Sequence, residues 1–225
     1  MFEKKSYSIE GEDLILASIF NNENKGYYLD IGCNHPVQHS NTYLFYLAGW
    51  RGLCIDPNAK FKIEFESFRP EDNFISAAVS SNPMKDTISY FSFGDNTLNS
   101  TCPNTAMDYT QRHGGYQENQ VDVISAKKVV EIFAKKKSDV LASFLNIDIE
   151  GGELEIISEF VKSELFFDII LVEIKKLNLS KIKSPIYDIL NSQYSLISKT
   201  PLNSIFIRRE SRFARRYPRE MIFCQ

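Results

Sequence analysis

Two aspartates stand at the ends of short apolar runs, and their spacing is typical of residues that bind a nucleoside. Asp30 ends the run that begins at Tyr27 and is followed by Gly32, and Asp56 ends a second run, 24 residues after that glycine. A glycine turn lets the backbone approach a ligand closely, and an acid at the tip of the next strand can accept hydrogen bonds from ribose hydroxyls. The pattern predicts a nucleoside-type cofactor. A βαβ unit with an ordinary glycine turn is the alternative.

More acids end two later apolar runs. Asp148 is followed two positions later by Glu150, and Glu173 ends the run that begins at Phe167. Because ligands bind over the carboxyl ends of the strands of an open parallel sheet, we expect all these acids to share one edge. Carboxylates gathered there need hydroxyls, a cation or a metal to offset their burial. The alternative is a set of separate salt bridges to nearby basic residues: Arg51, Lys175 and Lys176.

The elements that must position these acids alternate along the chain. Helices are predicted at 10–21, 40–48, 58–67 and 126–136, then from about 153 to 160, and at 184–192. Strands are predicted at 27–31, 52–56, 74–79, 88–93, 120–124, 140–148, 167–174, 194–199 and 203–208. This order predicts an α/β fold with a doubly wound, Rossmann-like, mostly parallel sheet. The last two strands are joined too closely for a helix, so they should form an antiparallel pair.

Two segments depart from this alternation. From 94 to 119 the periodic pattern stops, which predicts a lid or substrate collar, with plain disorder as the alternative. Tyr109 and Tyr116 could stack on a sugar or base there, and His113 could reach a substrate on closure. Trp50, outside the collar, is expected in the core. The tail, 208–225, holds six arginines between 208 and 219; it is either a solvated face or an arm that grips the phosphate of a nucleotide-linked sugar.

Composition restricts the class of protein. The 225 residues are 43% hydrophobic and 24% charged with a net charge of −3, which suits a single domain spanning 1–225 and gives no support for nucleic-acid binding. Residues 1–13 do not form a secretory signal, and no apolar run is long enough to span a membrane. The four cysteines lack metal-finger spacing and indicate free thiols in a cytoplasmic protein. A homo-oligomer is compatible with these features.

Several short motifs follow one another along the chain: 7–13, Leu29-Asp-Ile-Gly-Cys-Asn-His-Pro36, Ser40-Asn-Thr42, Gly49-Trp-Arg-Gly52, Ile55-Asp-Pro-Asn58, Arg69-Pro70, Ala78-Val-Ser80 and Asn146-Ile-Asp-Ile-Glu-Gly-Gly-Glu153. In these motifs and their order the chain resembles the FkbM-type S-adenosylmethionine-dependent methyltransferases, which have the class I methyltransferase fold. The chain departs from the pattern at Pro36, where many methyltransferases have glycine, and at Ile9 or Glu10, where the family usually has glutamine.

The resemblance implies a set of cofactor contacts. Asp30, Gly32 and Asn34 would line the methionine end of S-adenosylmethionine, and Asp56 would hold the ribose hydroxyls. Four further residues are expected to contact the cofactor: Ser40, Asn41, Thr42 and Pro57.

Methyl transfer to a hydroxyl requires alignment, worth about 7–11 kcal/mol, and removal of a proton. One solution is Mg²⁺ or Mn²⁺ held by Asp148, Glu150 and Glu173, because two of these acids stand where metal-dependent enzymes such as catechol O-methyltransferase keep oxygen ligands. A second solution is Asp148 or Glu150 acting directly, as the base or as a clamp on the hydroxyl. A third is a histidine base, with His35 preferred and His39 and His113 as other candidates.

The resemblance therefore implies an O-methyltransferase that acts on a carbohydrate hydroxyl, in a nucleotide-activated sugar or a surface-glycan precursor. The expected partner is a small-molecule or nucleotide-linked carbohydrate. One alternative is a nicotinamide-dependent oxidoreductase, disfavoured because the chain has no G-x-G-x-x-G motif. Another is a non-catalytic glycan-binding module of the same fold.

Overall fold

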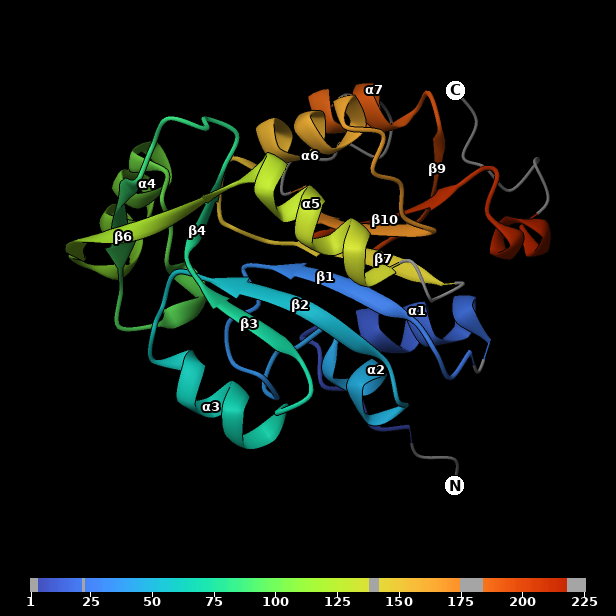
Figure 1. The fold of residues 1–225 in the computed structure, drawn as a ribbon. Coiled ribbons are helices and arrows are strands. Elements are labelled where there is room, and N and C mark those ends of the chain that lie inside the picture. Colours follow the sequence, from blue (N-terminus) through green and yellow to red (C-terminus); the bar gives the residue numbers. More distant parts are fainter. Residues whose placement is uncertain (1–3, 22, 138–141, 175–183, 218–225) are drawn as a thin grey trace.

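A computed structural model describes residues 4–21, 23–137, 142–174 and 184–217. Its main feature is a seven-stranded sheet with the strand order β3-β2-β1-β7-β8-β10-β9 (Figure 1). The strands are β1 (Tyr27–Ile31), β2 (Arg51–Asp56), β3 (Asn73–Ser76), β7 (Ser143–Ile147), β8 (Ile169–Glu173), β9 (Tyr194–Lys199) and β10 (Asn203–Arg208). The first five strands in this order are parallel, and β10 runs antiparallel to both β8 and β9. The predicted mostly parallel α/β sheet with an antiparallel C-terminal pair is confirmed.

Helices cover both faces of this sheet (Figure 1). On one face lie α5 (Ala126–Lys137), α6 (Glu153–Lys162) and α7 (Pro185–Leu190). On the other lie α1 (Glu12–Phe20), α2 (Tyr43–Leu47) and α3 (Phe61–Phe68). Each strand supplies side chains to both layers because successive residues point to opposite faces. Two separate hydrophobic cores result, one under each set of helices.

Strand β1 shows how this alternation positions polar groups. Leu29 and Ile31 belong to the core under α5, α6 and α7, whereas Tyr28 belongs to the core under α1, α2 and α3. Asp30 shares the parity of Tyr28, so its carboxylate is buried toward the second layer. Trp50 is fully buried in the second core, as predicted, and its indole nitrogen donates to the Glu23 carbonyl at 2.7 Å.

A smaller three-stranded sheet stands beside the main one. It consists of β4 (Ala78–Ser80), β5 (Thr87–Ser92) and β6 (Gln117–Ser125), in the order β4-β6-β5. The prediction of one strand at 74–79 is wrong, because the chain leaves the main sheet after Ser76. Ser76 pairs with Asp56 of β2, but Ala78 pairs with Val123 of β6.

The predicted collar at 94–119 is folded, so plain disorder is wrong there. It contains the short helix η1 (Asn96–Leu98), helix α4 (Pro103–His113) and the start of β6. Helix α4 escaped prediction because it is mostly exposed, with only Ala106 and Tyr109 buried, and therefore lacks an apolar stripe. Pro103 stands in the first turn of α4, where proline is favourable, but without an apolar period after it this signal did not predict a helix.

The remaining elements lie close to their predicted positions, with boundary differences. Helix α2 starts at Tyr43 rather than 40, and the Ser40 hydroxyl before it accepts the Tyr43 backbone N–H at 3.1 Å. The predicted strand at 140–148 begins partly outside the described residues. Near the end of the described chain lies helix η2 (Arg212–Arg216). No helix in the described ranges is long and apolar enough to cross a membrane.

Candidate active site

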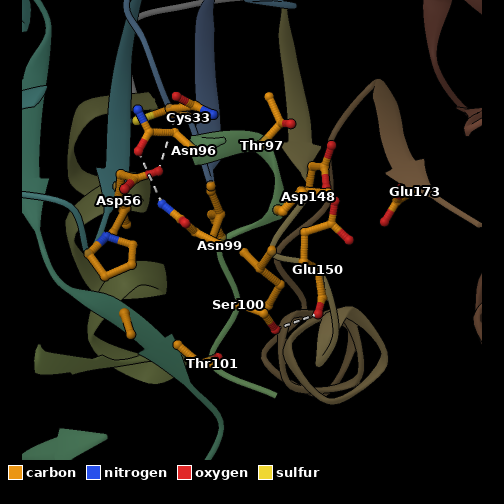
Figure 2. Close-up of a pocket in the computed structure, with 18 of the residues that line it drawn as sticks. Cys33, Asp56, Asn96, Thr97, Asn99, Ser100, Thr101, Asp148, Glu150 and Glu173 are labelled. Atoms are coloured by element: carbon orange, nitrogen blue, oxygen red, sulfur yellow. Dashed lines mark hydrogen bonds between the residues drawn. The ribbon is translucent and has the colours of Figure 1, made fainter. Parts of the chain in front are cut away.

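A pocket of about 380 Å³ lies at the carboxyl ends of β1, β2, β7 and β8 (Figure 2). That volume is in the usual range for a small-molecule site. The gathering of acids expected from the sequence is present, because all five carboxylates line this pocket: Asp30, Asp56, Asp148, Glu150 and Glu173. The proposed alternative of a salt bridge to Arg51 is not observed, since Arg51 pairs with Glu71. Lys175 and Lys176 lie outside the described residues.

The glycine turn after β1 is set by the neighbouring strand. Gly32 has a φ of 77°, and a Cβ at this position would lie 1.8 Å from the Asp148 carbonyl oxygen. Its amide donates to the Ile55 carbonyl at 2.8 Å. Glycine is therefore required here by the close approach of the segment that follows β7, in addition to any approach of a ligand.

Asp56 is held in place by two backbone amides. Its Oδ2 accepts the Asn34 N–H at 2.9 Å and its Oδ1 accepts the Asn58 N–H at 2.8 Å. Burial raises the pKa of Asp56 to about 6, although these two hydrogen bonds act to lower it. Each carboxylate oxygen has a further lone-pair site, so the ionised group can still accept hydrogen bonds from a pair of hydroxyls.

Asp30 is bound on both oxygens by side chains. Its Oδ2 accepts from the Thr42 hydroxyl at 2.6 Å, and its Oδ1 accepts from the Asn146 amide at 2.7 Å. Asn146 accepts in turn from the Asn41 amide at 3.0 Å. Burial raises the pKa of Asp30, and the positive charge of Arg69 opposes that rise.

Asn146 and Arg69 were not singled out from the sequence as site residues. Asn146 lines the pocket, and Arg69 is buried below it. Both stand in motifs that carried the family resemblance, the segments 146–153 and 69–70, which was the available signal. The contacts of Asn146 with Asp30 and of Arg69 with Thr42 join residues far apart in sequence, so no local pattern could reveal them.

The predicted cofactor residues divide into two groups. Six of them line the pocket: Asp30, Gly32, Asn34, Asn41, Asp56 and Pro57. Ser40 and Thr42 are not among the described residues that line it, and their contact with a cofactor stays a prediction. Both are buried. The Thr42 hydroxyl donates to the Asp30 carboxylate and accepts from Arg69, and the Ser40 hydroxyl accepts from Arg69.

The other three acids form a cluster. One carboxylate oxygen from each of Asp148, Glu150 and Glu173 lies within 4.8 Å of the others. Glu150 has a φ of 56° and opens a turn in which Gly151 and Gly152 also have positive φ. The Glu153 carboxylate accepts the Gly151 N–H at 2.9 Å and so stabilises this turn.

The collar packs directly on this turn. The Tyr109 hydroxyl donates to Glu150 Oε2 at 2.5 Å, and the Ser100 hydroxyl donates to the Glu150 carbonyl at 2.7 Å. The wall that the collar contributes is mostly polar and is lined by Asn96, Thr97, Leu98, Asn99, Ser100, Thr101, Tyr109 and Arg112 (Figure 2). Tyr116 and His113 are not among the described lining residues.

The geometry does not support His35 as a general base. The Nδ1 atom of His35 accepts the backbone N–H groups of Val37 and Gln38, both at 3.0 Å, and its Nε2 lies 3.8 Å from Glu64. The ring is therefore committed to its own turn and to α3, and His35 is absent from the described lining of the pocket. Of the three histidines in the sequence, His39 lines the pocket.

The arginine-rich tail begins at the opposite edge of the sheet. The Arg208 N–H donates to the carbonyl of Asp168, immediately before the start of β8, whereas the pocket lies at the carboxyl ends of the parallel strands. Arg209 donates to Ser195, and Arg212 pairs with Glu23. Up to residue 217, the tail gives no support to a phosphate-gripping arm at this pocket.

The sheet order and the acidic pocket at its carboxyl edge are consistent with a class I methyltransferase-like fold. A family model, the methyltransferase FkbM domain, matches residues 30–200, so the chain belongs to the FkbM methyltransferase family. No curated protein matches the chain significantly.

Proposed function

We propose that this protein is an S-adenosylmethionine-dependent O-methyltransferase that acts on a hydroxyl of a carbohydrate, in a nucleotide-activated sugar or a surface-glycan precursor. The observation that carries the proposal is that one pocket contains a carboxylate suited to a ribose and a separate cluster of three carboxylates. Asp56 is oriented for a diol, and the cluster of Asp148, Glu150 and Glu173 lies in the same pocket. Membership of the FkbM family supports methyl transfer over the nicotinamide-dependent alternative.

The cofactor side of the pocket fits S-adenosylmethionine in its chemistry. Asp56 would accept from the ribose hydroxyls, since its two backbone donors orient it and leave lone pairs available. Asp30 supplies negative charge on the same side as the turn at Gly32 and Asn34, which suits a positively charged sulfonium. When bound, S-adenosylmethionine supplies an electrophilic methyl group.

The cluster of Asp148, Glu150 and Glu173 would promote removal of the proton from the acceptor hydroxyl. Transfer forms a bond between the acceptor oxygen and the methyl carbon, breaks the bond from that carbon to sulfur, and releases the hydroxyl proton. Asp148 or Glu150 would accept this proton directly, with Glu150 oriented by Tyr109. A divalent cation, Mg²⁺ or Mn²⁺, is the second candidate, because Asp148, Glu150 and Glu173 offer three hard oxygen donors.

The collar wall supports a hydroxyl-rich acceptor. Its side chains are mainly amides and hydroxyls, which match the donors and acceptors of a sugar ring. Tyr109 lines the pocket and would offer a face for stacking against the ring.

Isothermal titration with S-adenosylmethionine tests the proposal first. The wild-type protein should bind it, and Asp56→Ala should bind it much more weakly. Absence of binding by the wild type, with binding of a nicotinamide cofactor instead, would overturn the assignment. Methyl transfer to a panel of nucleotide-activated sugars and free glycans would then exclude a non-catalytic binding module.

The metal is tested separately on the active protein. If a cation assists, exhaustive chelation should abolish transfer, Mg²⁺ or Mn²⁺ should restore it, and Glu173→Gln should raise the cation concentration that is required. If activity is complete after chelation and unchanged in Glu173→Gln, the proton is removed by Asp148 or Glu150 without a cation.

A further inference from the structure

A buried arginine lies beneath the turn that faces the cofactor side of the pocket. Arg69 follows α3 directly and is only 1% exposed. Its Nε donates to Asp72 Oδ2 at 2.7 Å, and its Nη2 donates to the Tyr28 hydroxyl at 2.9 Å. Arg69 is not among the described residues that line the active-site pocket, so it has no direct route to a ligand there.

The other terminal nitrogen of Arg69 reaches the turn itself. Its Nη1 lies 3.2 Å from the Pro36 carbonyl oxygen, 3.4 Å from Ser40 Oγ and 3.0 Å from Thr42 Oγ1. The Thr42 hydroxyl donates its single proton to Asp30 Oδ2 at 2.6 Å. It must therefore accept from Arg69, because a hydroxyl has only one proton and guanidinium can only donate. The hydrogen bonds run in one direction, from Arg69 through Thr42 to Asp30.

This arrangement addresses a specific electrostatic problem. Asp30 is 1% exposed, and a buried carboxylate is costly unless it is paired and hydrogen-bonded. Arg69 supplies the nearby positive charge. The Thr42 hydroxyl accepts a hydrogen bond from Arg69 and donates the one that orients Asp30 Oδ2. Asp72, which also accepts from the Gly52 N–H at 2.8 Å, anchors the guanidinium from the other side.

We propose that Arg69 is a positioning residue for the cofactor, acting through Thr42 to fix the Asp30 carboxylate and the 36–42 turn beside the pocket. The inference rests on the proposed function, since it takes S-adenosylmethionine as the ligand. It gives Arg69 a role in cofactor binding although its side chain does not line the pocket.

A matched set of threonine variants tests the hydroxyl in the middle of this path. Thr42→Val removes the hydroxyl and nearly preserves the volume, whereas Thr42→Ser keeps it. We expect Thr42→Val to weaken S-adenosylmethionine binding by roughly ten- to a hundredfold, the usual effect of losing a hydrogen bond to a charged group. Thr42→Ser should recover most of this loss. Thr110→Val, the same change on the exposed side of α4, should bind like the wild type.

A second variant tests the arginine and its coupling to Thr42. Arg69→Lys keeps the charge beside Asp72, but one ammonium cannot span the distance to both Asp72 and Thr42. It should also weaken binding, and the double variant should lose little more than the weaker-binding single variant, because both changes break the same path. Circular dichroism and thermal unfolding would establish that each variant is folded.

The outcomes separate this inference from the proposed function. If the wild type does not bind S-adenosylmethionine, the proposed function fails and this inference fails with it. If the wild type binds but folded Thr42→Val binds equally well, only the inference is overturned. Equal losses in Thr42→Val and Thr42→Ser, or fully additive losses with Arg69→Lys, would also overturn it, because they would reflect packing rather than a hydroxyl relay.

Discussion

The Asp30 carboxylate and the Asn146 side-chain amide lie next to each other on neighbouring strands, with 2.7 Å between Asp30 Oδ1 and Asn146 Nδ2. The parallel register of β1 and β7 places the two residues directly opposite each other. The amide is the donor that this buried carboxylate needs. A buried carboxylate at position 30 or at position 146 is therefore stable only when the residue opposite it on the adjacent strand donates a hydrogen bond.

Asn146→Asp should destabilise the fold at neutral pH by about 1–3 kcal/mol, because it replaces a donor with a second buried acid. Two adjacent carboxylates raise the pKa of one member, so the folded variant binds a proton that the unfolded chain releases at neutral pH. Its deficit in unfolding free energy relative to the wild type should therefore shrink as pH falls from 8 to 5. Urea unfolding at several pH values measures this, and a deficit that is constant with pH would contradict the pairing.

Cofactor binding should depend on pH through Asp56. Burial raises the pKa of this carboxyl to about 6, so the group is ionised above that pH and protonated below it. Only the ionised form offers all its lone pairs to ribose hydroxyls, so affinity for S-adenosylmethionine should fall as pH drops from 7.5 to 5. Calorimetric titration across this range measures the effect. In Asp56→Asn the affinity should be weak at all pH values, and the same pH dependence in this variant would assign it to another group.

Gly32→Ala should be strongly destabilising, by about 2–4 kcal/mol or more, because it combines a positive φ with a backbone clash. The added Cβ would lie 1.8 Å from the Asp148 carbonyl oxygen, and that carbonyl belongs to the backbone and cannot rotate away. Gly115→Ala is a matched control, since a Cβ there meets nothing within 4 Å. Chemical unfolding of both variants tests the argument, and equal stabilities would show that the turn relaxes.

Tyr109→Phe should loosen the collar while leaving the main sheet intact. The phenol donates to Glu150 Oε2 at 2.5 Å, and its loss removes a hydrogen bond to a charged acceptor that joins α4 to the turn after β7. Amide hydrogen exchange should become faster within Pro103–His113 and remain unchanged in β1 and β7. Tyr116→Phe, at a more exposed phenol outside the described pocket lining, is the control. Equal exchange in α4 for the two variants would show that the Tyr109 hydroxyl does not hold the collar.

The sequence predicted the main sheet because its strands are short apolar runs bounded by turns. It also predicted that acids ending those runs would meet, since the carboxyl ends of parallel strands share one edge. Asp56 and the cluster of Asp148, Glu150 and Glu173 were found in this way. The family followed from motifs spread along the chain, which need only residue identity and order.

Other features depended on contacts that no local pattern contains. Helix α4 has too few buried residues to show a helical period, and the break between β3 and β4 depends on which partner each strand meets. His35 was favoured because it follows the cofactor turn in sequence, but its ring hydrogen-bonds within its own turn instead.

By itself, then, the sequence determined the main sheet and the helices that cover it, the edge where the acids gather and the family. Only the tertiary structure decided which polar groups hold those acids: Asn146 for Asp30, Tyr109 for Glu150, and Arg69 beneath the turn. The physical reason is that apolar periodicity records the burial of each residue along its own segment. The partner of a buried polar atom is instead set by strand register and by side-chain direction between segments that lie far apart in the chain.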